Sequence, residues 1–388
     1  MITAIKGGKI ILEDSVAEGL SVYIENGKIK SVTSEELPCD AVIEANGAYI
    51  APGFVDIHIH GAANCDFLDN TAEAYKTIAR SCAIHGATSI VPTITSSTAE
   101  CMTESIKAYE EAKGYENGAN MLGLHFEGPY FAVSQKGAQD ERFIKAFDKE
   151  EYEAVLSSTD SVLRWTAAPE LDGAKEFAEY LTQNNILPCI GHSDADSTCA
   201  LKAFKYGFTH ATHLYSGMSS VHRKNAFRYA GVVEAAYLED DMTVEIIADG
   251  IHLPADLLKL IYKIKGANRI ALITDSMRGA GMPDGPSVLG GLKDGLEVII
   301  EDDVAKLPDR TAFAGSVAFC DRLVRNMINM AGVPIWDVMT MASYTPAKIV
   351  GCNSKGRIKE GFDADIVIFD SDINISHTII GGKVVYEA

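Results

Sequence analysis

The stretch PGFVDIHIHG, residues 52–61, decides the fold of this chain. Its apolar run, 54–58, has the length and composition of a buried β-strand, and Asp56, His58 and His60 interrupt or follow it. Residues 58 and 60 are two positions apart, so an extended backbone points both imidazoles to the same side. We therefore expect a strand whose C-terminal end presents a pair of histidines to one site.

Seven more short apolar runs follow, and they alternate with amphipathic stretches of helical length. This alternation is typical of βαβ units around a parallel sheet. The eight strand candidates are 54–58, 89–93, 121–127, 163–168, 187–192, 209–213, 244–249 and 270–275. Helices are expected over 71–85, 195–206 and 254–265, with Gly86, Gly207 and Gly266 as stop signals. Eight such units predict a (β/α)8 TIM barrel.

The two ends of the chain resemble each other and differ from the middle. Near the start, Asn26-Gly27 joins two β-rich runs as a tight hairpin, and near the finish Gly381-Gly382 lies between two similar runs. The β-rich runs at either end are too few to bury the apolar face of a sheet alone, so we expect the two chain ends to pair with each other. The predicted division is one small β domain from residues 1–51 and 346–388, with a barrel over 52–345.

Polar side chains interrupt or follow the predicted strands at the same end of each. Besides the first pair, Glu127, His192, His213 and Asp275 occupy such positions. In a barrel these ends share the C-terminal face, where active sites lie. A lone histidine there is usually structural. His85 and His377 lack this placement, and we interpret them as structural too. The combination of four histidines and two carboxylates instead predicts a divalent metal site, for zinc or another first-row ion.

Composition excludes several classes of protein. The chain has 388 residues, and 34 Lys plus Arg against 54 Asp plus Glu give a net charge of −20, which disfavours nucleic acid and anionic membranes as partners. The eight cysteines form no CxxC pair, and no apolar run is long enough for a transmembrane helix. We expect free thiols in a reducing cytoplasm.

Beyond these patterns, the chain resembles the N-acetylglucosamine-6-phosphate deacetylases of the metal-dependent amidohydrolase superfamily. The first quoted stretch and the closing segment GRIKEGFDADIVIFD mark the superfamily, whereas other stretches are more specific to the deacetylases. The matching stretches are PGFVDIHIHG (52–61), LHFEGPY (124–130), GHSDA (191–195), ATHLYSGM (211–218), ADGIHL (248–253), ITDSM (273–277), AFAGS (312–316), TPAKIVG (345–351) and GRIKEGFDADIVIFD (356–370).

The resemblance implies a hydrolase barrel flanked by a small β-sandwich, and a role for each polar strand-end residue. Glu127, His192 and His213 would hold one divalent ion, with zinc as the implied metal, and Asp275 would be the general base. Some relatives lack the first histidine pair; since His58 and His60 are present, a second ion that shares Glu127 is implied. The implied reaction converts N-acetylglucosamine 6-phosphate to glucosamine 6-phosphate and acetate, in a homodimer.

Three departures from the family pattern affect the substrate side. Ser216-Gly217 stand where Asn-Ala is common, although their main chain can still orient the sugar. Gln139 replaces the histidine credited with polarising the carbonyl; an amide donates a hydrogen bond but carries no charge. The usual His-Arg-Glu-Pro-Gly phosphate motif is absent, and the anion-binding candidates are Arg223, Arg228 and His252.

Other functions remain open from sequence. The altered 216–228 region favours N-acetylgalactosamine 6-phosphate or another N-acyl amino sugar as the alternative substrate. A sugar-phosphate-binding regulator without catalysis is a further alternative, although it would be expected to lose ligands or base, and none is missing. Cyclic amidases of the superfamily usually carry a carboxylated lysine on strand four, and the run 163–168 contains no lysine.

Overall fold

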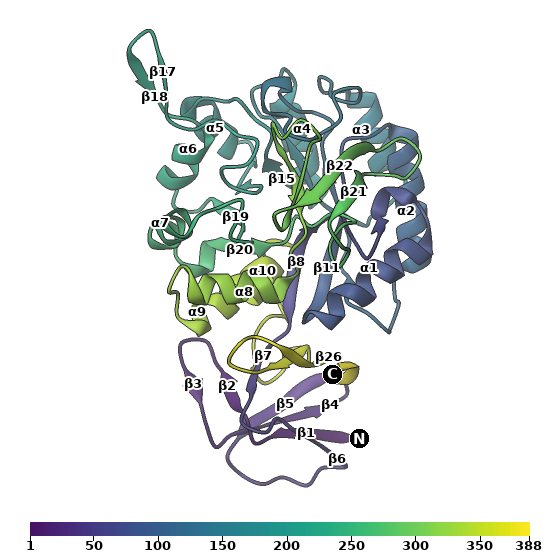
Figure 1. Cartoon of the computed structure of the whole chain (residues 1–388), viewed down its shortest axis with the longest axis vertical. Coiled ribbons are helices and arrows are strands. Elements are labelled where there is room, and N and C mark those ends of the chain that lie inside the picture. Colours follow the sequence, from purple (N-terminus) through teal and green to yellow (C-terminus); the bar gives the residue numbers. More distant parts are fainter.

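The computed structural model describes all 388 residues, and the eight predicted strands form one parallel barrel (Figure 1). Each strand pairs in parallel with the next one along the chain from β8 to β20. The strands are β8 (Phe54–Ile59), β11 (Ala87–Ile94), β13 (Leu124–Glu127), β14 (Val162–Ala167), β15 (Leu187–Ile190), β16 (His210–Ala211), β19 (Thr243–Ile247) and β20 (Ile270–Ile273).

A helix follows every barrel strand, which confirms the predicted (β/α)8 order. The predicted stop signals hold: Gly86, Gly207 and Gly266 have φ of 83°, 118° and 69°, the left-handed region that glycine tolerates. The helices are α1 (Ala72–Ile84), α2 (Ala99–Ala112), α3 (Lys149–Leu156), α4 (Ala174–Gln183), α5 (Ser197–Phe204), α6 (Val232–Leu238), α7 (Ala255–Lys265), α8 (Cys320–Asn329), α9 (Ile335–Met339) and α10 (Thr345–Ile349).

A buried carboxylate helps to close the barrel between its first and last strands. Asp56 Oδ1 on β8 accepts a hydrogen bond from the Thr274 backbone N–H at 3.2 Å, and its Oδ2 accepts one from the Thr274 hydroxyl at 2.5 Å. Just beyond, the Asp275 N–H donates to the His58 carbonyl at 2.9 Å. Burial raises the pKa of Asp56 to about 6, although the hydrogen bonds from Thr274 oppose that shift.

Both ends of the chain meet below the barrel in two packed sheets (Figure 1). Ile5 and Val22 from the first sheet share one apolar core with Ile50 and Ile366 from the second. The first sheet contains β5 (Lys28–Thr33), β4 (Ser21–Glu25), β1 (Ile2–Lys6) and β6 (Ala41–Glu44); the second contains β27 (Lys383–Glu387), β26 (Ile375–Ile380), β25 (Ile366–Phe369), β7 (Tyr49–Pro52), β2 (Lys9–Ile11) and β3 (Val16–Ala17).

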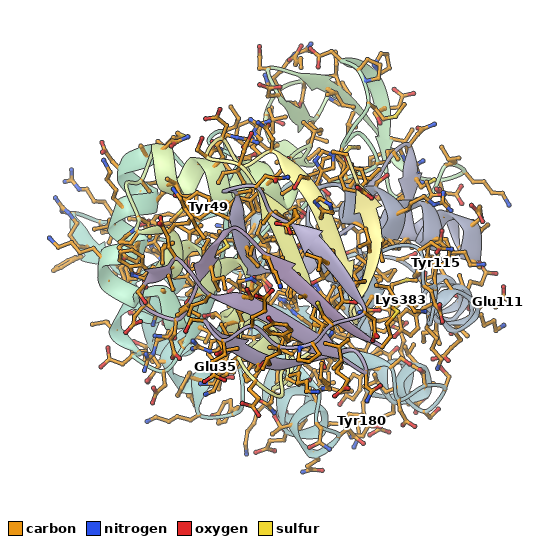
Figure 2. The ribbon with its side chains drawn as sticks, turned by 90° about the horizontal axis from the view of Figure 1, so that it is seen from below. Glu35, Tyr49, Glu111, Tyr115, Tyr180 and Lys383 are labelled. Carbon is orange, nitrogen blue, oxygen red and sulfur yellow. The ribbon has the colours of Figure 1, made fainter.

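The second sheet joins the two termini directly, because β25 pairs antiparallel with β7. Figure 2 looks onto this region from below and shows purple N-terminal strands beside yellow C-terminal ones. The hairpin prediction holds at Asn26-Gly27, where φ is 52° and 74°. The sandwich is therefore built from both chain ends, and the domain limits at residues 51/52 and 345/346 stay a prediction.

Two further strand groups were not predicted. An antiparallel sheet is inserted between β20 and α8, and a short exposed hairpin projects from the barrel before α6 (Figure 1). The sheet contains β21 (Gly285–Leu289), β22 (Leu296–Glu301), β23 (Val304–Lys306) and β24 (Phe313–Ser316), and the hairpin contains β17 (His222–Lys224) and β18 (Phe227–Tyr229). The remaining strands are the short β9 (Gly61–Ala62), β10 (Cys65–Asp66) and β12 (Asn120–Met121).

None of the helices combines the length and the apolar character needed to span a bilayer.

We predict that Asp56→Ala lowers the free energy of unfolding by about 3 kcal/mol, because backbone N–H groups that Asp56 satisfies would remain buried without an acceptor. Asp56→Asn keeps an oxygen for these donors and should cost less. Chemical denaturation measures both values, with the exposed Asp160→Ala as the control. Equal stability of the Asp56→Ala variant and the wild type would contradict this role.

Candidate active site

The six predicted strand-end side chains meet at the C-terminal mouth of the barrel, and all are buried. We call them the ligand cluster. His58 lies in β8 and His60 directly after it, Glu127 ends β13, and His192, His213 and Asp275 each lie two residues beyond β15, β16 and β20.

All four histidines of the cluster have the same tautomer. Each Nδ1 lies within hydrogen-bond distance of an oxygen that can only accept, so each Nδ1 carries a proton, and in the neutral ring each Nε2 presents a lone pair to the cluster. The acceptors are Glu245 Oε2 for His58 at 3.0 Å, the Thr93 carbonyl for His60 at 3.1 Å, the Gln135 carbonyl for His192 at 2.9 Å and the Ser216 carbonyl for His213 at 3.1 Å.

Three of these lone pairs converge on one oxygen of Glu127. Its Oε1 lies 2.8 Å from His213 Nε2, 3.1 Å from His192 Nε2 and 3.6 Å from His58 Nε2. A carboxylate oxygen and a neutral imidazole lone pair repel each other at such distances unless a positive charge lies between them. This part of the cluster therefore requires positive charge between its atoms, which protons on the rings or a metal ion can supply.

A second convergence involves Asp275. Its Oδ1 lies 3.0 Å from His60 Nε2 and 3.4 Å from His58 Nε2, and the two ring nitrogens are 3.3 Å apart. His58 thus belongs to both groups of potential ligands, one with Glu127 and His213 and one with His60 and Asp275. Within each group the ligand atoms lie within 4.8 Å of one another, so each could hold an ion.

The pKa shifts of Glu127 and His58 also show that this part of the cluster favours positive charge. Burial opposes ionisation of Glu127, but His58, His192 and His213 hold its pKa well below the usual value. Burial would lower the pKa of His58, yet Glu127 and Glu245 raise it to about 10, so without an ion the ring takes a second proton at Nε2, in the place that a bound metal ion would occupy. Buried imidazole and carboxylate donors in this arrangement suit zinc and related divalent ions. The chemistry of the donor set therefore fits a metal ion.

The backbone at three cluster positions is unusual. His192, His213 and Asp275 have φ of 48°, 27° and 47°, in the left-handed region that costs non-glycine residues free energy. Such a conformation persists where the surroundings impose it, and here the side chains are held by the contacts just described. Local strain of this kind concentrates at functional sites.

Gln139 lies against the cluster. Its Oε1 accepts from the Ser96 backbone N–H at 3.0 Å, and its Nε2 donates to Glu127 Oε2 at 2.7 Å. The orientation of the amide is unambiguous, because a backbone N–H only donates and a carboxylate only accepts. The structure therefore brings this sequence-predicted residue to a ligand oxygen, where it orients the carboxylate.

Ser216 and Gly217 pack against two histidines of the cluster. The Ser216 carbonyl accepts from His213, as described above. A side chain at position 217 would come within 2.8 Å of His192 Nδ1, and Gly217 has a φ of 54°. Glycine is therefore required here by both space and conformation.

The three anion-binding candidates lie apart from one another. His252 is held by Asp249, whose Oδ2 accepts from His252 Nδ1 at 2.7 Å, and its ring lies beside Phe313. Arg223 and Arg228 face each other across the exposed hairpin β17–β18, which projects away from the barrel (Figure 1). The structure of the single chain does not bring these two arginines to the ligand cluster.

Sequence reasoning missed the charged residues beneath the cluster. Arg164 on β14 and Glu245 on β19 are fully buried and form an ion pair inside the barrel. The available signal was a charged residue within an otherwise apolar strand, as in VLRWTA (162–167) and TVEII (243–247). Buried charges need partners, and these partners come from distant strands.

We predict that Zn²⁺ stabilises the protein and that a chelator reverses the effect. A ligand at one hundred times its Kd adds about 2.7 kcal/mol to the free energy of unfolding. His192→Ala should remove most of this gain, whereas the exposed His222→Ala should retain it. Thermal unfolding with and without Zn²⁺ checks both; an undiminished gain in His192→Ala would contradict the site.

Comparison with known proteins places this geometry in a family. The model of the amidohydrolase family matches residues 49–385. The chain is 32% identical to an N-acetylglucosamine-6-phosphate deacetylase of Lysinibacillus sphaericus, over 95% of this chain and 93% of that protein. It is also 32% identical to the enzyme of that name from Bacillus subtilis (strain 168), with 98% and 96% covered.

Solved structures agree with the sequence matches. The crystal structure of N-acetylglucosamine-6-phosphate deacetylase from Pasteurella multocida superimposes with a TM-score of 0.92 at 27% identity, over 100% of both chains. The enzyme of that name from Thermotoga maritima gives a TM-score of 0.87 at 32% identity, over 99% of this chain and 100% of that one. The chain belongs to the amidohydrolase family.

Proposed function

We propose that this protein hydrolyses the N-acetyl group of N-acetylglucosamine 6-phosphate, giving glucosamine 6-phosphate and acetate. The observation that carries the proposal is the ligand cluster, in which four imidazole lone pairs and two carboxylates face one buried space at the barrel mouth. The relatives that match nearly the whole chain are named for this deacetylation.

The proposed metal ligands are Glu127, His192 and His213 for one divalent ion, with His58 and His60 available for a second; zinc is the proposed identity. A divalent ion supplies Lewis acidity, which polarises an amide carbonyl and makes a water molecule easier to deprotonate. Zinc suits the mixture of nitrogen and oxygen donors in this cluster.

Asp275 is the proposed general base and acid. Burial would raise its pKa, but a hydrogen bond from the protonated His60 ring and the charge of the nearby histidines lower it when no ion is bound, so the carboxylate is ionised at neutral pH and can accept a proton. In the reaction a C–O bond forms as the amide C–N bond breaks. Asp275 takes one proton from water and delivers it to the departing amine nitrogen.

Gln139 has a different proposed role from that of the histidine common at its position. One of its amide protons is already donated to Glu127, and its carbonyl oxygen is bonded to the Ser96 N–H. We propose that it orients Glu127, and that polarisation of the acetyl carbonyl depends on the ion. The sugar would be oriented by Ser216 and Gly217 main-chain groups and by His252.

The proposed assembly is a homodimer in which the hairpin β17–β18 contributes to phosphate binding. Phe227, which pairs with Lys224 near the tip of the hairpin, is 70% exposed, and a second copy would cover this apolar ring. The cytoplasm is the proposed location, supported by eight free cysteines.

The second candidate function is deacetylation of N-acetylgalactosamine 6-phosphate or another N-acyl amino sugar. The region 216–228, which departs from the pattern of the deacetylases, favours it. Initial rates of acetate release on a panel of both epimers, each with and without the 6-phosphate, distinguish the two candidates.

We predict that Asp275→Asn lowers kcat for acetate release by roughly 10²–10⁴-fold, the usual contribution of general acid–base catalysis. The zinc content should be measured in parallel, so that loss of metal is not mistaken for loss of the base. Asp284→Asn, on an exposed segment, is the matched control. Undiminished turnover in Asp275→Asn would remove this residue as the base.

We also predict that Arg223→Ala and Arg228→Ala raise KM for the 6-phosphorylated sugar by about tenfold each, since a hydrogen bond to a charged group contributes about 1.5–3 kcal/mol. Activity on the unphosphorylated sugar should not change. A preserved preference for the phosphorylated substrate in both variants would show that phosphate binds elsewhere.

A further inference from the structure

Glu245 is a fully buried carboxylate beneath the ligand cluster to which no role has yet been given. Its Oε2 accepts from His58 Nδ1 at 3.0 Å and from the His213 backbone N–H at 3.2 Å. Its Oε1 pairs with the Arg164 guanidinium and lies 3.2 Å from His210 Nε2. One side chain therefore contacts two of the ligand-bearing segments from below.

The contact with His58 determines which nitrogen of that ring faces the cluster. Because the carboxylate can only accept, the His58 proton is held on Nδ1, and Nε2 keeps its lone pair toward Glu127 and Asp275. His58 is the ring shared by both groups of potential ligands. An error in its tautomer or orientation would therefore affect both groups.

Arg164 compensates the negative charge of Glu245 inside the barrel. Its guanidinium is fully buried, pairs with Glu245 and also donates to the Ile57 carbonyl at 3.2 Å. The pair is neutral overall, so Glu245 can accept from His58 without adding net charge below the cluster. An unpaired carboxylate at the same depth would carry a large desolvation cost.

We propose that Glu245 is a positioning residue for the metal centre, which fixes the Nδ1–H tautomer of His58 and holds the backbone at His213. It does not face the substrate side of the cluster, so it acts through its neighbours. The inference rests on the metal centre of the proposed function and is independent of which sugar is the substrate.

The isosteric substitution Glu245→Gln separates this role from simple space filling. If its NH₂ group faces His58, Nδ1 must become an acceptor and the ring proton moves to Nε2, where it blocks the ligand lone pair. If the amide is flipped, the NH₂ group instead meets the guanidinium of Arg164, donor against donor. Neither orientation satisfies all the partners that the carboxylate satisfies.

The experiment measures Zn²⁺ affinity of the full-length protein by competition with a chromophoric chelator. Glu245→Gln should weaken Zn²⁺ binding about 10–100-fold, the usual effect of losing a residue that supports a metal ligand. Glu110→Gln is the matched control: this partly buried carboxylate accepts from Ser161 Oγ at 2.6 Å and contacts no residue of the ligand cluster. It should leave Zn²⁺ affinity within about threefold of wild type.

A double-mutant cycle with His58→Asn tests whether Glu245 acts through that ring. In the His58→Asn background, Glu245→Gln should weaken the remaining Zn²⁺ binding far less than in the wild type, because coupled residues are not additive. An undiminished loss in that background, or wild-type affinity in Glu245→Gln alone, would overturn the proposal and leave Glu245 as the counter-ion of Arg164.

Should Glu245→Gln fold poorly because Arg164 loses its counter-ion, Arg164→Met with Glu245→Gln removes the unpaired charge and should show the same loss of affinity. ¹⁵N spectra of the histidine rings provide a readout that mere structural damage would not mimic, namely the shift of the His58 proton from Nδ1 to Nε2. A wild type that binds no Zn²⁺ would overturn this inference and the metal centre together, whereas one that binds Zn²⁺ but releases no acetate would overturn only the proposed reaction.

Discussion

The site depends on one electrostatic constraint: lone pairs and carboxylate oxygens are held together in a buried space where they repel one another. Each histidine of the ligand cluster is fixed from behind by an acceptor, so none can turn its N–H toward the carboxylates. Low dielectric strengthens both the repulsion and the attraction of a cation. The rigid strands of the barrel hold these side chains in place although the side chains repel one another.

Much of the fold and the cluster could be predicted because the signals are local. Polar residues at the ends of apolar runs predicted both the strands and the shared face, and glycine marked where helices stop. The inserted sheet β21–β24 was missed although Gly290-Gly291 and Asp302-Asp303 lie between its strands, because these strands are only partly buried and stand outside the alternation of strands and helices. Glu245 and Arg164 were missed because a charged residue can be predicted to be buried only when its partner is known. The two residues lie on separate strands, so the sequence does not show that they pair.

The substrate side was harder to predict for a different reason. Arg223 and Arg228 have the right chemistry for phosphate, yet the chain places them on a projecting hairpin, so their role depends on what else approaches that hairpin. Gln139 illustrates the opposite case. Its position in sequence relates it to a substrate-binding residue, whereas its hydrogen bonds tie it to Glu127. A side chain's neighbours, more than its place in a motif, determine what it can do.

The pairing of β7 with β25 also constrains the order in which the molecule can form during synthesis. Residues 49–52 leave the ribosome before the barrel, but their partner, 366–369, is made only after it. The N-terminal strands must therefore wait with one edge open while the barrel units assemble in sequence. The sandwich can close only after residues 366–369 have emerged, and until then its exposed edge is a site where chaperones or neighbouring chains can bind.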